Sequence, residues 1–341
     1  MVRARAPLRL GFAGGGTDVS PFCDEYGGAV LNATIGMFAY ASILSRTDDV
    51  VELHTTDSGD SAAFSAKESL PLDPRFALHR GVYERVVRDF CDGKRFACTI
   101  YTHCDAPPGS GLGSSSTVVV ALLAAFQELL GLPLGEYELA RLAFSIERQD
   151  LAMAGGKQDQ YAAAFGGVNF MEFLADDVVI VNPLRVKRSF LSELEASLVL
   201  YFTGVSRASA SIIKEQIGNM READSDAVSA ALQLKADAVD IKHAVLTSDV
   251  ARFARVLNRS WEAKKQMAKQ ITNPQIDAIY ELAMANGAYA GKVSGAGGGG
   301  FMMFICDPAR RPNLVRRLSE TEGQVFNAHF VEAGAEAWLP R

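Results

Sequence analysis

A glycine- and serine-rich stretch leads straight into a long apolar run in the first half of the chain. The stretch is Pro108-Gly109-Ser110-Gly111-Leu112-Gly113-Ser114-Ser115-Ser116, and the run Thr117–Leu130 has no charge before Glu128. Glycines let several backbone amides converge, and the first amides of a helix have no partner within it. With the positive end of the helix dipole they favour a polyphosphate, and serine hydroxyls can bind a cation such as Mg²⁺. We predict a phosphate-binding loop before a buried helix; a tight turn with a serine N-cap is the alternative.

Two further glycine clusters are Gly14-Gly15-Gly16-Thr17-Asp18 and Ser294-Gly295-Ala296-Gly297-Gly298-Gly299-Gly300. Two familiar nucleotide-binding patterns are excluded. The P-loop needs a lysine after its last glycine, and none follows Gly113. The segment from Gly295 to Gly300 spells the dinucleotide fingerprint, but Phe301–Ile305 indicates a buried strand where that fingerprint requires a helix. We therefore predict a loop between two strands at this place.

Phosphoryl transfer needs an acid that holds metal and an acid that orients the attacking hydroxyl. The segment from Ser145 to Gln160 is the best candidate region. Within it, Asp159 follows Gly155-Gly156 near the start of a predicted helix, where a carboxylate stays ionised and has a fixed direction. An ordinary acid in a first helical turn is the alternative.

The composition is that of a water-soluble globular protein without a nucleic-acid partner. The chain has 341 residues, a formal net charge of −6 and 48% apolar residues. A protein that coats nucleic acid needs a basic face, and a membrane span needs about 18 or more apolar residues in a row; we find neither. Arg9 and glycines interrupt the apolar start, so we predict no secretory signal. Five scattered cysteines and five unclustered histidines predict reduced thiols in a cytoplasmic protein and no structural zinc site.

Strand-like and helix-like segments mix throughout, which predicts an α/β (α+β) fold. The predicted strands are Leu8–Ala13, Ala29–Leu44, Val50–His54 (paired with the one before), Phe96–Thr102, Gly167–Phe173, Val178–Val181, Ser197–Phe202, Tyr289–Val293, Phe301–Cys306 and Gln324–Phe330. The predicted helices are Gly81–Phe90, Thr117–Leu130, Tyr137–Ala152, Lys157–Phe165, several between Arg207 and Asn286, and Pro312–Glu320. The change of pattern near residue 190 predicts two domains, 1–190 and 191–341.

The three glycine motifs, in this order, resemble those of the GHMP family of small-molecule kinases. The resemblance rests on Pro7 to Asp18, Pro108 to Ser116 and Lys292 to Gly300, and so spans nearly the whole chain. It implies an N-terminal ATP-binding domain, a ferredoxin-like C-terminal domain with extra helices, and a site in the cleft between them. It also implies ATP and Mg²⁺ as cofactors.

Within the family, Ala6-Pro7-Leu8-Arg9 before the glycine triplet resembles the kinases of heptose 7-phosphate and the related fucokinases. The segment Thr203-Gly204-Val205-Ser206-Arg207 and the pair Glu215-Gln216 resemble the heptose branch. The resemblance implies ATP-dependent phosphorylation of the anomeric hydroxyl of D-glycero-D-manno-heptose 7-phosphate, on the way to GDP-heptose for bacterial surface polysaccharide. Another sugar kinase, such as a fucokinase, and a sugar- or nucleotide-binding sensor without turnover are the alternatives. A homo-oligomer is possible.

The resemblance also implies roles for single residues. Asp159 is the expected catalytic carboxylate beside the anomeric hydroxyl, and Arg9 is expected to pair with it or to stabilise the moving phosphoryl group. Ser115, with Ser114 and Ser116 as possible replacements, and Glu147 are the expected magnesium ligands. The expected nucleotide-binding residues are Pro108, Gly109, Ser110, Gly111, Leu112, Gly113, Ser114, Ser115 and Ser116.

The acceptor sugar is expected to contact the first and third glycine motifs. Asp18 is expected to bind sugar hydroxyls, with a loop cap as its alternative role. A phosphosugar brings a dianion, so a basic pocket is expected, with Lys157 and Arg207 as candidates and Arg185, Lys187 and Arg188 as substitutes. The expected substrate residues are Thr17, Asp18, Lys157, Gly204, Arg207, Ser294, Gly295, Gly297 and Gly298.

Overall fold

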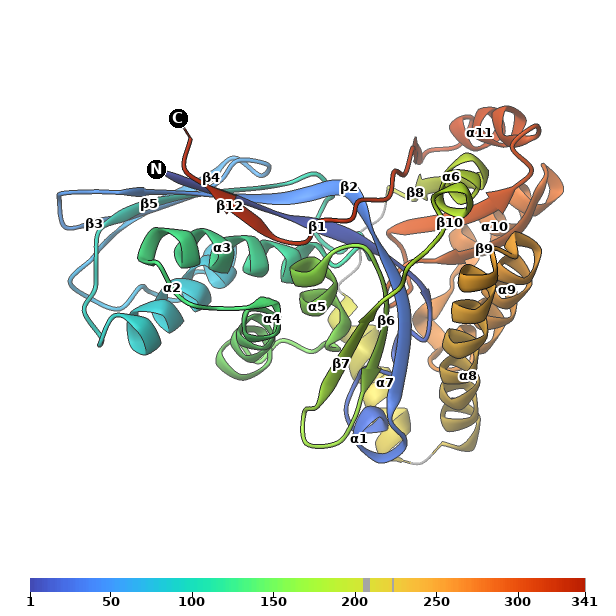
Figure 1. The fold of residues 1–341 in the computed structure, drawn as a ribbon, viewed down its shortest axis with the longest axis horizontal. Helices are drawn as coiled ribbons and strands as arrows, with labels where there is room; N and C mark the ends of the chain where they lie inside the picture. Colours follow the sequence, from blue (N-terminus) through green and yellow to red (C-terminus); the bar gives the residue numbers. More distant parts are fainter. Residues whose placement is uncertain (205–208, 223, 341) are drawn as a thin grey trace.

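Two β-sheets organise the chain (Figure 1). The structure is a computed structural model and describes residues 1–204, 209–222 and 224–340. The strands are β1 (Val2–Ala13), β2 (Gly28–Ser45), β3 (Val50–Thr55), β4 (Asp60–Ser65), β5 (Cys98–Cys104), β6 (Val168–Phe173), β7 (Val179–Pro183), β8 (Leu198–Phe202), β9 (Ala288–Val293), β10 (Phe301–Cys306), β11 (Gln324–Phe326) and β12 (Glu336–Trp338). The helices are α1 (Phe22–Tyr26), α2 (Ala77–Phe90), α3 (Ser114–Leu130), α4 (Glu136–Ser145), α5 (Gln158–Phe165), α6 (Arg188–Ser197), α7 (Ser209–Arg221), α8 (Ser225–Thr247), α9 (Val250–Lys265), α10 (Pro274–Ala285) and α11 (Arg311–Ser319).

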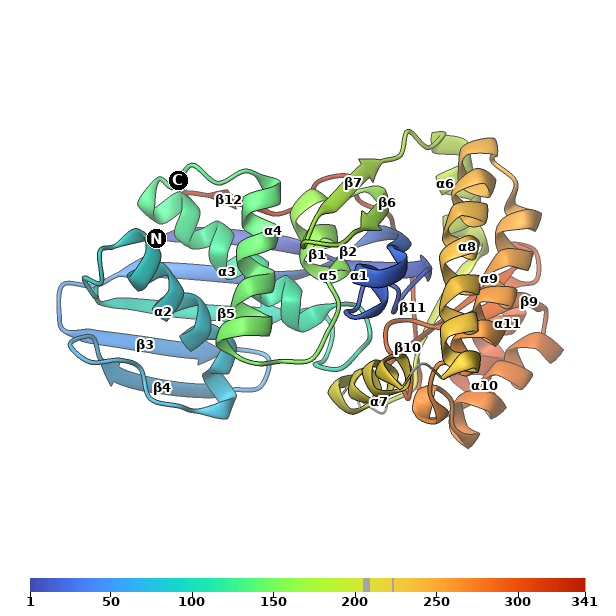
Figure 2. The same cartoon turned by 90° about the horizontal axis from the view of Figure 1, so that it is seen from below.

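The larger sheet is built on the long strand β2. Its strand order is β12-β1-β2-β5-β3-β4, while β6 pairs with the other end of β2 and β7 pairs with β6. Helices α2 to α5 cover one face of this sheet (Figure 2). In the second half of β2, Ala39, Ala41 and Ile43 are buried between more exposed residues, as a half-buried strand requires.

One predicted strand pairing is wrong. Val50–His54 was expected to pair with the strand Ala29–Leu44, but β5 lies between the two. Strand β3 pairs in parallel with β5, after a crossover connection through β4 and α2. Parallel neighbours need such a crossover. Strand β5 returns through it to a place between β2 and β3, so these two consecutive strands are not partners.

The smaller sheet has the antiparallel order β11-β8-β10-β9. The predicted domain boundary at residue 190 falls in α6, between the last strand of one group and the first of the next. The chain then returns: β12, which the sequence pattern did not predict, pairs with β1 in the larger sheet. The predicted strand Gln324–Phe330 also ends early, at Phe326. The division into domains 1–190 and 191–341 stays a prediction.

Helix α3 lies against the larger sheet and is buried nearly all round, which explains why its sequence has no polar face before its C-terminal end. Helices α8 and α9 pack against β1 and β2 from the other side, and Phe253 of α9 meets Phe12 of β1 with ring centroids 5.1 Å apart. The two sheets therefore share one hydrophobic core. This shared packing fixes the loops of one half relative to the loops of the other. The site lies where these loops meet.

Within the described residues, no helix is long and apolar enough to cross a membrane. The five cysteines are free thiols, four of them buried. In the same part of the chain, no group of three or more His, Cys, Asp or Glu side chains comes close enough together to hold a metal ion.

Candidate active site

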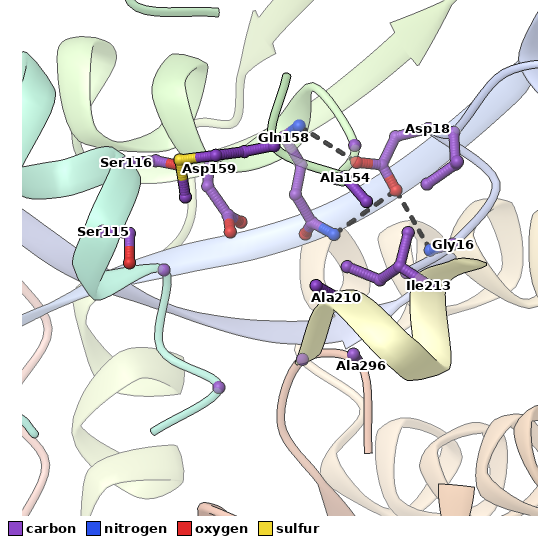
Figure 3. A pocket seen from close by; sticks show the side chains of 18 of the residues that line it. Gly16, Asp18, Ser115, Ser116, Ala154, Gln158, Asp159, Ala210, Ile213 and Ala296 are labelled. Carbon is purple, nitrogen blue, oxygen red and sulfur yellow. Dashed lines mark hydrogen bonds between the residues drawn. The ribbon is translucent and has the colours of Figure 1, made fainter. Parts of the chain in front are cut away.

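A cavity of about 380 Å³ lies where loops of both halves meet. The starts of α3 and α5, the glycine triplet after β1, the loop between β9 and β10, and helices α7 and α9 contribute to its lining. Figure 3 shows Asp159 and Ser115 on one side of the opening and Ala210 and Ile213 of α7 on the other. The cavity thus combines the three glycine motifs that are far apart in the sequence.

Asp159 and Arg9 form an ion pair at this cavity. Arg9 Nε lies 2.8 Å from Asp159 Oδ1, and Arg9 Nη2 lies 2.6 Å from the same oxygen. The guanidinium is buried and is also held by the carbonyl of Gly111 at 2.6 Å. Both contacts fall on Oδ1, so the pair orients the carboxylate and leaves Oδ2 to face the cavity. The predicted juxtaposition of these two residues is present.

Asp18 fixes the start of α5, the helix that carries Asp159. Its Oδ2 accepts from the backbone amides of Lys157 (2.9 Å) and Gln158 (3.1 Å), and its Oδ1 accepts from the amide of Gly16 at 3.0 Å. These bonds satisfy amides that a helix start leaves free. The Asp18 carboxylate fits here because residue 156 is a glycine; a Cβ at that position would lie 1.9 Å from Asp18 Oδ2. Asp18 therefore caps the N-terminal end of α5, and its contact with sugar hydroxyls stays a prediction.

Glu147 lies on a wide helical turn that interrupts the predicted helix Tyr137–Ala152. Helix α4 ends at Ser145, and the amide of Leu151 donates to the carbonyl of Ile146, five residues earlier, at 3.0 Å. Such π-type turns are frequent at functional sites. The turn lets the buried Glu147 side chain line the cavity beside the start of α3.

The Glu147 carboxylate has protein donors at both oxygens. Ser116 Oγ donates to Oε1 at 3.0 Å, and the amide of Gln160 donates to Oε2. Burial raises the pKa of Glu147. Burial disfavours the ionised form of this carboxylate, and a bound cation would favour it. The Glu147 side chain therefore fits a place that a cation occupies during function. Ser115, which precedes Ser116 on α3, also lines the cavity. The Glu147 carboxylate and the Ser115 hydroxyl are oxygen ligands of the kind that Mg²⁺ prefers.

The phosphate-binding loop and the third glycine motif pack backbone against backbone. A Cβ on Gly111 would lie 2.3 Å from the carbonyl oxygen of Ser294, and Ser294 Oγ donates to the carbonyl of Gly111 at 2.9 Å. The amide of Phe301 donates to the carbonyl of Ser110 at 2.8 Å. The glycines of the third motif thus admit a loop between two strands, as predicted, and hold it against the first helical turn of α3.

A second cavity of about 490 Å³ adjoins the start of α3 on the other side. It shares Ser114 and Ser115 with the first and is walled by Leu78, Pro107 and Val118 among others. His79 lies in its wall, and burial lowers the pKa of its imidazole to about 4, so the ring is neutral at pH 7. A largely apolar pocket beside a phosphate-binding loop fits a nucleobase.

Two lysines are buried close to the first cavity. Burial lowers the pKa of Lys264 to about 8 and that of Lys292 to about 7. Lys264 Nζ donates to the carbonyl of Gly15 at 2.9 Å, and Lys292 Nζ donates to the carbonyl of Phe12 at 3.2 Å. Their hydrogen-bond acceptors are neutral, although Asp18 and Asp237 favour the charged forms of Lys264 and Lys292 from a greater distance.

The structure brings many, though not all, of the predicted site residues to the cavities. The predicted residues that line the first cavity are Arg9, Asp18, Gly109, Gly111, Gly113, Ser114, Ser115, Ser116, Glu147, Asp159 and Gly295. Pro108, Ser114 and Ser115 line the second. The linings of these two cavities do not include Thr17, Ser110, Leu112, Lys157, Gly204, Ser294, Gly297 and Gly298. Arg207 lies outside the described residues.

Two of the residues outside the linings have clear structural contacts. Thr17 Oγ1 joins the glycine triplet to β2, through the carbonyls of Gly14 and Ala29 at 2.7 and 3.0 Å. Lys157 Nζ is turned toward Asp177, 2.6 Å from its Oδ1. The Lys157 side chain is therefore not brought to the cavity, and a part in holding a phosphate stays a prediction for it.

Sequence reasoning missed Lys264, Gln216 and the second cavity. A signal for Lys264 exists, because the apolar face of α9 runs through Phe253, Leu257 and Trp261, and Lys264 continues it by one more turn. A lysine on a buried helical face needs a reason. The second cavity gathers residues from segments around 55–58, 74–79 and 102–108, and no local pattern joins these.

Comparison with known proteins agrees with this geometry. The model of the GHMP kinases N terminal domain matches residues 77–167, and that of the GHMP kinases C terminal domain matches residues 241–323. The D-glycero-alpha-D-manno-heptose 7-phosphate kinase of Campylobacter jejuni is 44% identical over 337 residues, which cover 99% of this chain and 98% of that protein.

Solved structures extend the comparison. A D-glycero-D-manno-heptose 1-phosphate kinase from Bacteroides thetaiotaomicron superposes with a TM-score of 0.86 at 44% identity, covering 100% of both chains. Galactokinase from Lactococcus lactis, at 19% identity, shares the fold with a TM-score of 0.78 over 98% of this chain and 94% of that one. With two matched family models and a relative 44% identical over nearly its whole length, this chain belongs to the GHMP kinase family.

Proposed function

We propose that the chain phosphorylates the anomeric hydroxyl of D-glycero-D-manno-heptose 7-phosphate with ATP, and so supplies the route to GDP-heptose. The observation that carries the proposal is the Arg9–Asp159 pair, which faces a cavity beside the free amides of α3. The heptose 7-phosphate in the name of the Campylobacter jejuni relative supports the choice of acceptor. The name of the Bacteroides thetaiotaomicron structure, a heptose 1-phosphate kinase, supports a heptose phosphate without supporting the position of the phosphate.

Asp159 positions the acceptor hydroxyl and receives its proton. The anomeric oxygen forms a bond to the γ-phosphorus as the bond from that phosphorus to the leaving oxygen of ADP breaks, and the hydroxyl proton passes to Asp159 Oδ2. A carboxylate is a weak base, which suits a loose transition state in which the proton leaves late. Arg9 holds the carboxylate in place for this transfer.

The nucleotide is proposed to extend across both cavities. Its base would occupy the second cavity, and its phosphates would meet the amides around Gly111 and Gly113 at the start of α3. Ser115 and Glu147 would hold Mg²⁺, which supplies charge neutralisation to the phosphate oxygens. The five free thiols support a reducing compartment such as the cytoplasm.

The alternatives have weaker support. The L-fucokinase/L-fucose-1-P guanylyltransferase of Bacteroides fragilis is 26% identical, and this chain covers 37% of its length. A sensor without turnover has no need of an oriented carboxylate in the cavity, and Asp159 has that orientation.

A coupled assay of ADP release tests the proposal. It compares heptose 7-phosphate, mannose, L-fucose and galactose, with Asp159→Ala in parallel. The proposal predicts turnover confined to heptose 7-phosphate and lost in the variant. Preferential turnover of an unphosphorylated sugar would refute the proposed acceptor, and full activity of the variant would refute the role of Asp159.

A further inference from the structure

The end of the active-site cavity away from Asp159 carries a buried ammonium group, that of Lys264, which forms no ion pair with a carboxylate in the described part of the chain. Lys264 at the end of α9 is 4% exposed, and its ammonium contacts the Gly15 carbonyl at 2.9 Å, Gln216 Oε1 at 3.4 Å and Met267 Sδ at 3.9 Å. All three acceptors are neutral, and among the described residues no carboxylate comes within ion-pair distance of Lys264 Nζ. The Asp18 carboxylate favours the charged form of Lys264 from a greater distance, but burial outweighs it and lowers the pKa of Lys264 to about 8. The ammonium therefore has room for a direct anionic partner.

Gln216 adds a second unused group at the same place. It is 3% exposed and lines the cavity, and its Nε2 has no hydrogen-bond partner in the described part of the chain. Buried amide donors are rarely left unpaired. Gly16 keeps the space between the two side chains open, because a Cβ there would lie 2.8 Å from Lys264 Nζ and 3.2 Å from Gln216 Oε1.

The chemistry of this end of the cavity points to an anion. An ammonium and an amide N–H, both buried and both facing one cavity, are donors for the oxygens of a phosphate monoester. Lys214 lies on α7, as Gln216 does, and also lines the cavity. Its side chain is exposed and supplies a second cation at the rim of the cavity. A phosphate oxygen forms a charge-assisted hydrogen bond with the Lys264 ammonium, which is stronger than the bond that a neutral sugar hydroxyl forms.

The other cations of the lining are already engaged elsewhere. Arg9 is paired with Asp159, and Arg148 donates to the carbonyls of Met153 at 3.3 Å and Gly156 at 3.1 Å on the side of Glu147. In Figure 3 the residues of α7 lie across the opening from Asp159. A sugar with its anomeric hydroxyl at Asp159 thus extends its far end toward α7 and Lys264.

We propose that Lys264 and Gln216 form the subsite for the phosphate that the acceptor sugar already carries, and so select a phosphosugar over a free sugar. This rests on the proposed function. It differs from the sequence-based prediction that Lys157, whose ammonium is turned to Asp177, holds this phosphate.

Steady-state kinetics of Lys264→Met test the subsite, with heptose 7-phosphate and the same heptose without phosphate as acceptors. We expect kcat/KM for the phosphosugar to fall about 10- to 100-fold, as for one lost charge-assisted hydrogen bond. For the free heptose it should change less than about threefold. Lys265→Met, one residue further on α9 and paired with Glu262, is the matched control and should leave both values unchanged.

The outcomes separate the subsite from the proposed function. Equal losses on both acceptors, or no loss on either, would overturn the subsite while the wild-type rates still establish the kinase. Wild-type enzyme that shows no preference for the phosphosugar would overturn the proposed acceptor and the subsite together. Gln216→Leu provides a second variant and should lower the same preference. Thermal unfolding controls the fold of each variant.

Discussion

Because Asp18 caps the start of α5, its replacement should lower both the stability of the protein and the rate of the reaction at Asp159. In Asp18→Ala, the amides of Lys157 and Gln158 lose their acceptor. Hydrogen bonds to a charged group contribute about 1.5–3 kcal/mol each, so two of them give about 3–6 kcal/mol. Because these amides adjoin the cavity and water can reach them in the variant, we expect the lower value, about 3 kcal/mol in free energy of unfolding.

The same change should displace Asp159, which lies in the first turn of α5. A displacement of about 1 Å at a reacting group can lower the rate by about 100-fold. We expect kcat of Asp18→Ala to fall about 100-fold, with KM for the acceptor changed less than about threefold.

Asp18→Asn should behave differently from Asp18→Ala. Its oxygen can still accept from the two α5 amides. Because its NH₂ replaces Oδ1, the bonds from the Gly16 amide and from Gln158 Nε2 are lost together with the charge. The Gln158 side chain can turn its Oε1, which has no partner among the described residues, to this NH₂, so kcat should fall less than about tenfold.

The assay is steady-state ADP release at saturating ATP, with urea unfolding for stability. Asp226→Asn, an exposed acid in the first turn of α8, is the control and should match wild type. A large rise in KM at unchanged kcat, or an Asp18→Asn variant as impaired as Asp18→Ala, would refute the positioning role of Asp18.

Three other perturbations have definite outcomes. Gly156→Ala places a Cβ 1.9 Å from Asp18 Oδ2 and should lower kcat as Asp18→Ala does, whereas Gly218→Ala on α7, with open space around it, should not. Glu147→Gln should fold, because the Gln160 amide can turn its unpartnered Oε1 to the new NH₂, but should raise the Mg²⁺ concentration for half-maximal rate tenfold or more; an unchanged Mg²⁺ requirement would contradict a metal role. Stability without ligand should rise from pH 7 to pH 9, since Lys264 and Lys292 have pKa values of about 8 and about 7 when folded against 10.5 when unfolded. The unfolded chain then binds more protons, which adds at most about 1.4 kcal/mol per pH unit for each lysine; the double Lys→Met variant should lose this slope, and an equal slope in both proteins would contradict it.

The sequence predicted which of its motifs meet at the cavity better than it predicted the partners of their side chains. The residues Asp159, Arg9 and Glu147 lie in local motifs whose glycines, helix starts and acids have direct physical meaning, and the structure places all three at the cavity. Their partners come from elsewhere: Asp18 reaches the amides of α5 about 140 positions away in the sequence, and Ser116 rather than Ser115 contacts Glu147. Such partners depend on tertiary packing.

The fold shows the same limit. Long periodic segments such as α3 and β10 were predicted almost to the residue, because burial and capping act locally. The neighbours of β3 and the return of β12 to β1 could not be predicted, since strand pairing joins residues far apart in the sequence. Lys157 was assigned to the phosphate by its place beside Asp159, but successive residues at a helix start point in different directions, and its ammonium meets Asp177.

The central claim is that Asp159, held by Arg9, directs phosphoryl transfer to the anomeric oxygen of a heptose phosphate. Phosphorus NMR of the product formed from ATP and heptose 7-phosphate tests it most directly, with wild type and Asp159→Asn compared at equal, saturating nucleotide. The account predicts a sugar bisphosphate with its new phosphate on the anomeric carbon, formed at least about 1,000-fold more slowly by the variant. A new phosphate at another hydroxyl, or a variant within tenfold of wild type, would contradict it.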